Sequence, residues 1–208
     1  MLELINVGQR YGRKQVLDGV THKFAPGVTV ITGPSGAGKT TLLRLCASAE
    51  RPKNGTLNWN GKPLKRSLRA FRAGLGYAPQ RIDFPEDISG LDFMLHMAAL
   101  KMVGTGAAKT QATALLDRLG LGRDASGLIR TYSGGMRRRL GIAQAFLGDP
   151  DVLVLDEPTA ELDSVTAGHV HDLIFEQTCV VLMTTHLAES LANRKYETLK
   201  ISMLDPVK

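Results

Sequence analysis

The chain has 208 residues with a formal net charge of +6, and 43% of its residues are hydrophobic and 22% charged. These values are ordinary for a soluble globular protein, and no stretch reaches the ~18 apolar residues that would span a bilayer. The first residues lack the basic region and apolar run of a signal peptide, and the two cysteines, Cys46 and Cys179, form no disulfide framework, as in reduced cytosolic proteins.

The first half of the chain alternates strand and helix patterns. Residues 28–32 form a β-branched run that predicts a buried strand leading into a glycine-rich loop, and residues 40–47 predict the helix that follows. Residues 55–61 predict a strand bounded by turns. Over residues 64–72, apolar and basic residues alternate at helical spacing, which predicts a short amphipathic helix.

The second half begins with a helical stretch. Residues 84–146 are rich in Leu, Ala, Met and Lys, and residues 91–102 and 109–119 both fit helices. Continuous apolar runs at residues 151–156 and 179–185 predict two further buried strands. Apolar strands separated by helices indicate an α/β fold with a parallel sheet covered on both faces.

A phosphate-binding motif stands between the first predicted strand and its helix, because residues 33–40 match G-x-x-x-x-G-K-[ST]. Glycines let the backbone curl so that successive N–H groups point at phosphate oxygens, and the helix N-terminus adds its positive dipole end. Lys39 would reach the β- and γ-phosphates, and the Thr40 hydroxyl would bind Mg²⁺. The flanking strand and helix favour this interpretation over a glycine-rich turn without a ligand.

A pair of carboxylates ends the strand predicted at residues 151–156. Asp156 would lie at the carboxyl edge of the sheet, where open α/β sheets bind ligands, and would hold Mg²⁺ through water. Glu157 would then polarise or deprotonate the attacking water. A solvated Asp-Glu pair explains this segment equally well when it is taken alone, and the phosphate loop favours the functional interpretation.

A second helix N-terminus lies at the end of the helical stretch. Ser133, Gly134 and Gly135 precede an arginine-rich helical segment, so the free backbone donors there could bind a second phosphate. In isolation, an ordinary helix with Ser133 as its N-cap is the simpler explanation.

Several segments follow one another in a recognisable order. After the phosphate loop come Tyr77-Ala78-Pro79-Gln80, Tyr132-Ser133-Gly134-Gly135-Met136, Leu155-Asp156-Glu157-Pro158-Thr159, Ala160-Glu161-Leu162-Asp163 and Thr184-Thr185-His186. From about residue 2 to 203, this order and spacing resemble the ATP-binding subunits of ABC transporters, and the segment at Ser133 separates that family from other phosphate-loop ATPases.

The resemblance implies a particular version of the α/β fold. It is a phosphate-loop NTPase (RecA-like) core with a mostly parallel sheet, an N-terminal antiparallel β subdomain and an inserted α-helical subdomain. The whole chain, 1–208, would be a single domain. Residues 1–83 and 147–208 would form the catalytic core with the β subdomain, and residues 84–146 the helical signature subdomain.

The resemblance also implies roles for single residues. Tyr11 resembles the aromatic residue that stacks on adenine, although local packing of a loop tyrosine is the alternative. Gln80 resembles the glutamine that touches Mg²⁺ and reports to the membrane partner, Asp163 the residue that links two ATP sites, and His186 the switch histidine at the γ-phosphate. The implied nucleotide-binding residues are Tyr11, Gly33, Pro34, Ser35, Gly36, Ala37, Gly38, Lys39, Thr40, Thr41, Gln80, Ser133, Gly134, Gly135 and Asp163; the metal-binding residues are Thr40, Gln80 and Asp156; the catalytic residues are Glu157 and His186.

Three features depart from the usual pattern of the family. Met136 replaces the glutamine that closes the signature segment, so one polar contact is missing. Ala160 and Glu161 replace small residues and put a charge near the expected dimer seam. The sequence ends about twenty residues after His186, so no regulatory C-terminal domain is expected.

The resemblance implies that ATP joins two copies of the chain, each ATP lying between residues 33–40 of one copy and Ser133 to Gly135 of the other. Hydrolysis would power transport through separate membrane permease subunits, with a homodimer held at the inner, cytoplasmic face of the cell membrane. The export-type subunits are the nearer resemblance. A groove around Ile82, Phe84, Pro85 and Ile88 is a candidate docking surface for the permease, and ordinary packing of the helical lobe is the alternative.

Two other classes of function remain open. The basic excess fits an ABC-type ATPase acting on nucleic acid or ribosomes. Such relatives carry two ATP domains or a long coiled-coil insertion, which this sequence lacks, so nucleic acid is not expected as a partner. A nucleotide-dependent assembly module that does not hydrolyse ATP is the third reading, and the presence of Glu157 and His186 argues against it.

Overall fold

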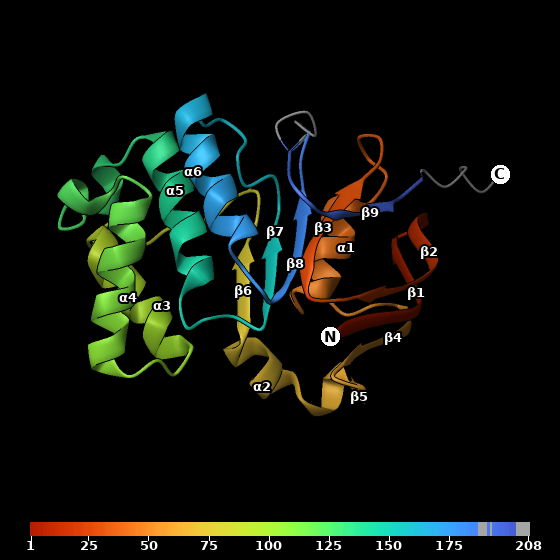
Figure 1. Cartoon of the computed structure of the whole chain (residues 1–208). Coiled ribbons are helices and arrows are strands. Elements are labelled where there is room, and N and C mark those ends of the chain that lie inside the picture. Colours follow the sequence, from red (N-terminus) through yellow and green to blue (C-terminus); the bar gives the residue numbers. More distant parts are fainter. Residues whose placement is uncertain (187–190, 192, 203–208) are drawn as a thin grey trace.

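The computed structural model describes residues 1–186, 191 and 193–202, which form two sheets flanked by helices (Figure 1). One sheet is parallel and the other antiparallel, and the antiparallel sheet is built largely from the N-terminal strands. The parallel sheet has the order β6 (Leu75–Ala78), β7 (Val152–Leu155), β8 (Val180–Thr184), β3 (Gly27–Thr32) and β9 (Glu197–Lys200). The antiparallel sheet has the order β2 (Lys14–Phe24), β1 (Leu2–Tyr11), β4 (Asn54–Trp59) and β5 (Lys62–Pro63).

The parallel sheet divides the interior into two hydrophobic cores, because successive side chains of a strand point to opposite faces. In β7, Val152 and Val154 belong to the core shared with the antiparallel sheet, whereas Leu153 and Leu155 belong to the core under the helices. All four are buried, as expected for a strand inside a parallel sheet. The predicted α/β fold with a parallel sheet covered on both faces is confirmed.

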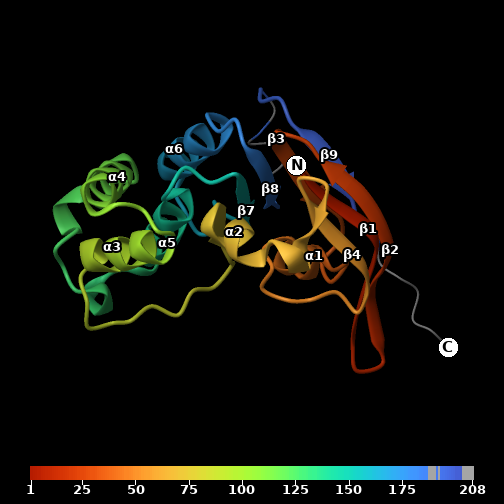
Figure 2. The ribbon, with the colours of Figure 1, turned by 90° about the horizontal axis from the view of Figure 1, so that it is seen from below.

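Helix α1 (Lys39–Cys46) lies between the two sheets and fills the first of these cores (Figure 2). Leu42 and Leu45 are completely buried there, and the core thereby fixes the direction of the helix. Cys46 is a buried free thiol, and burial raises its pKa well above the ordinary value, so it stays protonated. The N-terminus of α1 consequently points to the edge of the sheet where β3 ends.

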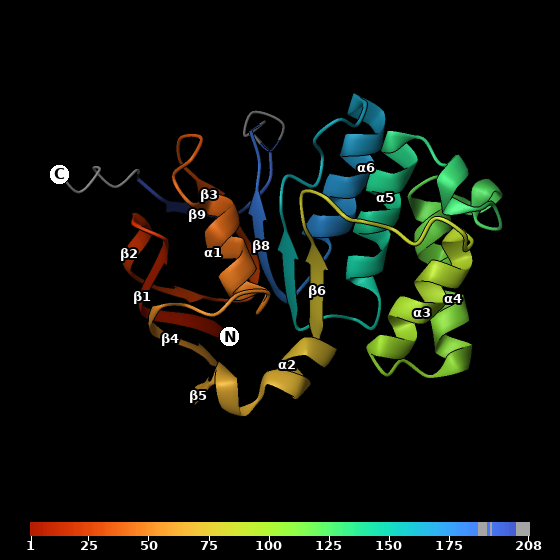
Figure 3. The ribbon, with the colours of Figure 1, turned by 180° about the vertical axis from the view of Figure 1, so that it is seen from behind.

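A second group of helices lies on the side of the opposite face of the parallel sheet. Helix α6 (Ser164–Phe175) packs on the sheet, and α3 (Gly90–Leu100), α4 (Thr105–Arg118) and α5 (Gly134–Ala143) form a lobe beside it (Figure 3). Ser133 is the N-cap of α5, since its hydroxyl accepts from Met136 N at 3.2 Å. The predicted helical stretch is confirmed, while the subdomain boundaries at residues 84 and 146 stay a prediction.

Two predicted elements are shorter than expected. The strand expected over residues 55–61 ends at Trp59, because Asn60 and Gly61 have φ angles of 49° and 74° and turn the chain into β5. The helix expected over residues 64–72 is broken at Ser67, whose φ is −127°, into a 3-10 turn and helix α2 (Leu68–Ala73). Both breaks occur where the backbone leaves the conformation that the periodic pattern assumes.

Lys101 joins the end of α3 to the segment that follows α5, and it makes stability depend on pH. Its ammonium donates to Leu147 O at 2.7 Å and Ala145 O at 3.2 Å, and burial lowers its pKa to about 8. The folded state therefore holds this proton less tightly than the unfolded state, so Lys101 makes the free energy of unfolding rise as pH increases from about 8 towards the unfolded value near 10.5.

Replacing Lys101 by Met should remove that rise. We expect the unmodified protein to gain up to about 3 kcal/mol relative to Lys101→Met between pH 8 and 10.5, measured by urea unfolding at several pH values. A difference in stability that stays constant over this range would contradict the assigned role of the ammonium.

Candidate active site

A cleft of about 400 Å³ opens at the carboxyl edge of the parallel strands, where ligands of open α/β sheets bind. The chain segments that follow β3, β6, β7 and β8 converge there, joined by the hairpin between β1 and β2. The cleft is lined by Tyr11, Lys14, Val16, Ser35, Gly36, Gly38, Lys39, Thr40, Thr41, Gln80, Asp156, Glu157 and His186. Most residues predicted to bind nucleotide or metal are thus brought together.

The glycine-rich loop depends on the absence of side chains at two positions. At Gly33, φ is 149° and an added Cβ would lie 2.2 Å from the carbonyl oxygen of Ile201. At Gly38, φ is 97° and an added Cβ would lie 2.9 Å from Val16 Cγ1. Since Pro34 and Ala37 are closed into the same loop by the 3.2 Å bond from Ala37 N to Pro34 O, the backbone curls as the motif requires.

Unpaired backbone donors line the phosphate end of the cleft. Gly38 is the N-cap of α1 and provides no side-chain cap. Among the described residues, nothing accepts a hydrogen bond from the amides of Gly36, Gly38, Lys39 and Thr40. The Lys39 ammonium lies over the same loop and donates to Gly33 O at 2.8 Å and Pro34 O at 3.0 Å. This set of donors with a cation can bind an anion of several oxygens.

Asp156 provides an oxygen suited to a divalent cation. The side chain is 2% exposed, and its Oδ1 accepts from Thr184 Oγ1 at 2.7 Å. Its Oδ2 is buried and has no hydrogen-bond partner within the described part of the chain. A buried carboxylate oxygen without a partner is costly unless a cation or water satisfies it. With the hydroxyl of Thr40 and the amide of Gln80 in the same cleft, these oxygens fit Mg²⁺.

Glu157 is held beside His186 in a constrained conformation. Its φ of 52° is unusual for a residue with a side chain, and its amide donates to Thr184 Oγ1 at 2.9 Å. The carboxylate accepts from His186 N at 3.2 Å, and its other oxygen lies 3.1 Å from His186 Nε2. Glu157 is buried while the His186 ring is largely exposed. The two predicted catalytic residues therefore lie in contact.

Tyr11 lies at the rim of the cleft, in the hairpin between β1 and β2. It is 44% exposed, so an aromatic face is available to a base. Its hydroxyl donates to the Glu50 carboxylate, to which Gln9 and Arg44 also donate, at 3.2 Å and 3.3 Å. The stacking role and local packing are thus compatible in one side chain, and the stacking role stays a prediction.

Ser133, Gly134, Gly135 and Asp163 lie outside the cleft. No described residue accepts from the amides of Gly134 and Gly135, and a Cβ at either position would meet nothing within 4 Å, so the start of α5 is uncrowded there. Asp163 caps α6, since its carboxylate accepts from Thr166 N at 3.0 Å. In a single chain the signature segment and Asp163 do not join the phosphate loop.

The sequence reasoning missed two contributors to the site. Thr184 joins the two carboxylate residues, because its hydroxyl donates to the side chain of Asp156 and accepts from the amide of Glu157. A polar residue at the end of a predicted strand was the available signal. Arg138 of α5 donates to carbonyl oxygens of the residues at the cleft, and nothing in the sequence indicates these contacts.

The candidate docking groove is partly occupied by the protein itself. The Phe84 ring packs edge-on against Phe93 of α3, with centroids 5.1 Å apart, and Ile88 packs on the same core. Ile82 Cδ1 lies so close to Gly141 that a Cβ there would approach it to 2.6 Å. This favours the packing alternative. No helix in the described residues has the length and apolarity needed to cross a membrane.

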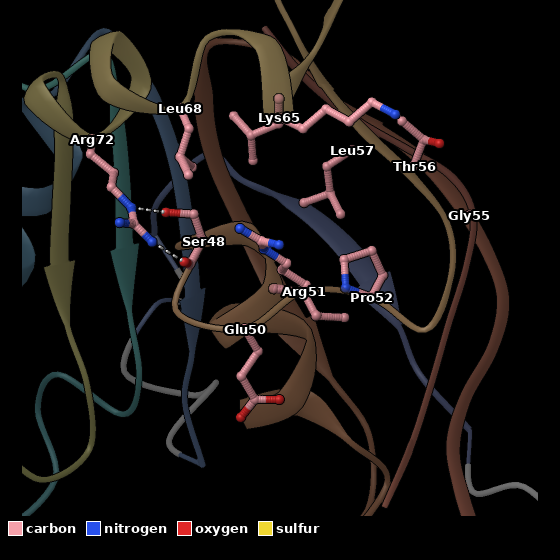
Figure 4. A pocket seen from close by; sticks show the side chains of 12 residues that line it. Ser48, Glu50, Arg51, Pro52, Gly55, Thr56, Leu57, Lys65, Leu68 and Arg72 are labelled. Atoms are coloured by element: carbon pink, nitrogen blue, oxygen red, sulfur yellow. Dashed lines mark hydrogen bonds between the residues drawn. The ribbon is translucent and has the colours of Figure 1, made fainter.

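A separate hollow of about 320 Å³ lies between the end of α1, β4 and α2 and shares no lining residue with the cleft (Figure 4). Leu57 and Leu68 contribute to its apolar lining. The Arg72 guanidinium donates to Ser48 Oγ at 3.0 Å and Ser48 O at 2.9 Å, and so ties α2 to the turn after α1. This hollow takes no part in the site at the sheet edge.

Comparisons with known proteins agree with this geometry. A daunorubicin resistance ATP-binding protein, DrrA3, of Streptomyces coeruleorubidus is 37% identical over 193 residues, covering 89% of this chain and 61% of the relative. A Nod factor export ATP-binding protein I of Paraburkholderia xenovorans is 35% identical over 196 residues, covering 90% and 63%. The chain therefore spans about three fifths of the length of these curated relatives.

A solved structure and a family model extend the comparison. The dimeric structure of an ATP-binding cassette in a post-hydrolysis state, bound to ADP and Pi, superposes with a TM-score of 0.83 at 23% identity, covering 97% of this chain and 96% of that one. This likeness confirms the expected phosphate-loop fold. The family model described as ABC transporter matches residues 17–160. The chain belongs to the ABC transporter family.

Proposed function

We propose that the chain is an ATP-binding and hydrolysing subunit that powers transport through separate transmembrane subunits. The observation that carries the proposal is the cleft itself. There, unpaired loop amides and Lys39 stand opposite the unpaired oxygen of Asp156 and the contact between Glu157 and His186. Donors for a polyphosphate and a carboxylate beside the expected attack site are what phosphoryl transfer to water needs.

Binding would begin at the loop. Phosphate oxygens would accept hydrogen bonds from the amides of Gly36, Gly38, Lys39 and Thr40. The Lys39 ammonium would leave the loop carbonyls to which it now donates and would donate to the β- and γ-phosphates instead. Thr40, Asp156 and Gln80 would hold Mg²⁺, which supplies neutralisation of the charge on the phosphates when bound. Tyr11 would stack on the adenine at the rim.

Hydrolysis would depend on Glu157. Its carboxylate is held by His186 N and its amide by Thr184, so it cannot swing freely, and it would accept a proton from the attacking water. His186 would contact the γ-phosphate from the exposed side of the cleft. The transition state would be stabilised by Lys39 and the loop amides, which are already oriented before the reaction.

We propose that two copies of the chain dimerise, because one chain provides only half of the nucleotide site that the family resemblance implies. The amides of Gly134 and Gly135 lie outside the cleft and have no acceptor among the described residues, and we propose that they reach the γ-phosphate of a second, identical copy. ADP would leave them without a partner, and hydrolysis would therefore loosen the dimer. The pair would act at the cytoplasmic face of the membrane, and the export functions in the names of the relatives favour an exporter.

The molecules that copurify with the chain distinguish transport from the alternative function on nucleic acid. The basic net charge is the feature that fits this alternative. The tagged chain would be isolated from detergent-solubilised membranes of its own cells, in parallel with the Lys39→Ala variant. We expect a multi-spanning membrane protein in stoichiometric amount, and Mg²⁺-dependent ATP hydrolysis by the purified complex. Recovery of RNA or DNA without a membrane protein would overturn the transport proposal.

A further inference from the structure

Helix α5 carries consecutive arginines whose side chains reach different parts of the molecule. Arg137 pairs with the Glu86 carboxylate at 2.9 Å, a contact at the surface. Arg139 donates to Leu119 O at 2.8 Å and so ties α5 to the end of α4 within the helical lobe. Arg138 points instead towards the candidate active site. All three side chains have partners within the chain.

Arg138 holds two chain segments with one guanidinium. Its Nη1 donates to Pro79 O at 3.0 Å and to Gln80 O at 2.8 Å. Its Nη2 donates to Asp156 O at 2.7 Å and also to Glu157 O. Gln80, Asp156 and Glu157 are the metal-binding and catalytic positions proposed above. A planar guanidinium with donors in a fixed fork is suited to fixing several oxygens at once.

The guanidinium lies where the sheet ladder ends. Strands β6 and β7 pair in register up to Ala78 and Leu155, and Asp156 N donates to Ala78 O at 2.9 Å. Beyond this bond the two chains separate, since Gln80 enters a loop and Glu157 turns away with a φ of 52°. Past the ladder, the carbonyls of the two segments no longer face each other's amides, and Arg138 donates to them instead.

The surroundings of Arg138 strengthen these bonds. Its Nε is buried without a hydrogen-bond partner among the described residues. Burial lowers the pKa of the guanidinium, and the nearby carboxylates of Asp156, Glu161 and Glu157 oppose this shift. In such a poorly solvated place a charged donor binds a carbonyl more strongly than it would in water.

We infer that Arg138 is a positioning residue that transmits the position of α5 to Gln80 and Glu157. This inference rests on the proposed function. The first turn of α5 carries Gly134 and Gly135, which would bind the γ-phosphate of the second copy, and the same rigid helix carries Arg138 about one turn later. Closure of the dimer on ATP would thus set the backbone of Glu157 and of the metal-binding loop in each copy.

The test compares Arg138 with its neighbour. Arg138→Met and Arg138→Lys would be measured beside Arg139→Met, which removes an arginine from the same helix without touching the cleft. We expect kcat for ATP hydrolysis to fall roughly 10- to 100-fold in Arg138→Met, because a misplacement of about 1 Å costs that much. KM for ATP should change less than about threefold, since the loop at residues 33–40 is untouched.

Further readouts separate positioning from a general loss of structure. Arg138→Lys, which keeps the charge but not the fork, should have an intermediate kcat, and Arg139→Met should stay within about twofold of the unmodified protein after correction for folded fraction. Hydrogen exchange at the amides of residues 80–83, 156, 157, 159 and 160 should accelerate in Arg138→Met and not in Arg139→Met.

The outcomes are distinguishable. Equal kcat in Arg138→Met and the unmodified protein, or an equal loss in Arg139→Met, would overturn the positioning role and leave the ATPase proposal standing. If Arg138→Met does not fold, a kcat of Arg138→Lys equal to that of the unmodified protein would overturn the role in the same way. An unmodified protein that neither binds nor hydrolyses Mg·ATP would overturn the proposed function, and this inference with it.

Discussion

Replacing Glu157 by Gln is expected to lower ATP hydrolysis by roughly 10²- to 10⁴-fold. The glutamine side chain has the same shape and keeps an oxygen for the bond from His186 N, but it cannot take a proton from water. Binding of Mg·ATP should persist, because the loop donors and Asp156 are unchanged. Phosphate release by the purified variant, followed beside nucleotide binding, measures both effects.

The same variant should stay dimeric in the presence of Mg·ATP. Since hydrolysis removes the γ-phosphate that would join the two copies, a protein that cannot hydrolyse should elute as a dimer in size exclusion with ATP and as a monomer with ADP. Glu176→Gln is the control, because Glu176 forms a surface ion pair with Arg118 far from the cleft. Normal turnover in Glu157→Gln would remove Glu157 from its catalytic role.

Replacing Lys39 by Ala is expected to weaken nucleotide binding about 10- to 100-fold and to reduce dimerisation with it. The ammonium is the cation that lies on the loop, and loss of a charged hydrogen bond of about 1.5–3 kcal/mol weakens binding about 10- to 100-fold. Titration with a fluorescent ATP analogue measures the affinity, and light scattering measures the mass of the species formed.

A matched control for this variant is Lys65→Ala. Lys65 is an exposed lysine that lines the separate hollow and lies outside the cleft, so its loss should change neither affinity nor mass. If Lys39→Ala kept the affinity of the unmodified protein for ATP, the phosphate-loop assignment would be wrong.

The centre of the parallel sheet could be predicted because its inner strands, β7, β8 and β3, form largely apolar runs. β7 and β8 are buried on both faces, so each is a continuous apolar run that can be recognised in the sequence without knowing which strands lie beside it. β6 was not predicted, although it is an equally real strand. It contains Gly76, where an added Cβ would lie 2.0 Å from Ala145 O, so close packing of another backbone determines this residue and local propensity does not.

The antiparallel sheet was expected only from the family resemblance. β1 has register shifts on both of its pairings, so inward and outward residues do not alternate regularly along it. A period of two is the signal by which a half-buried strand is recognised, and bulges remove it. The periodicity of the sequence therefore does not identify residues 2–11 as a strand.

The site residues also divide into those that a sequence pattern reveals and those that only the structure reveals. Loop amides could be anticipated from the motif, because glycine spacing determines backbone shape. The contacts of Thr184 and Arg138 could not be anticipated. Both side chains bond backbone groups of distant segments, and because every residue has such groups, the residue types do not reveal these contacts. A position of Gly134 and Gly135 outside the cleft of the same chain was implied only by the family resemblance, because the residues alone fit an ordinary helix N-cap equally well.

A crystal structure of Glu157→Gln with Mg·ATP tests most directly whether two copies close around each nucleotide. We predict that the amides of Gly134 and Gly135 of one copy lie about 3 Å from γ-phosphate oxygens held by residues 33–40 of the other. Glycine amides that stay remote from every nucleotide, in a protein with ATP bound, would contradict the shared site.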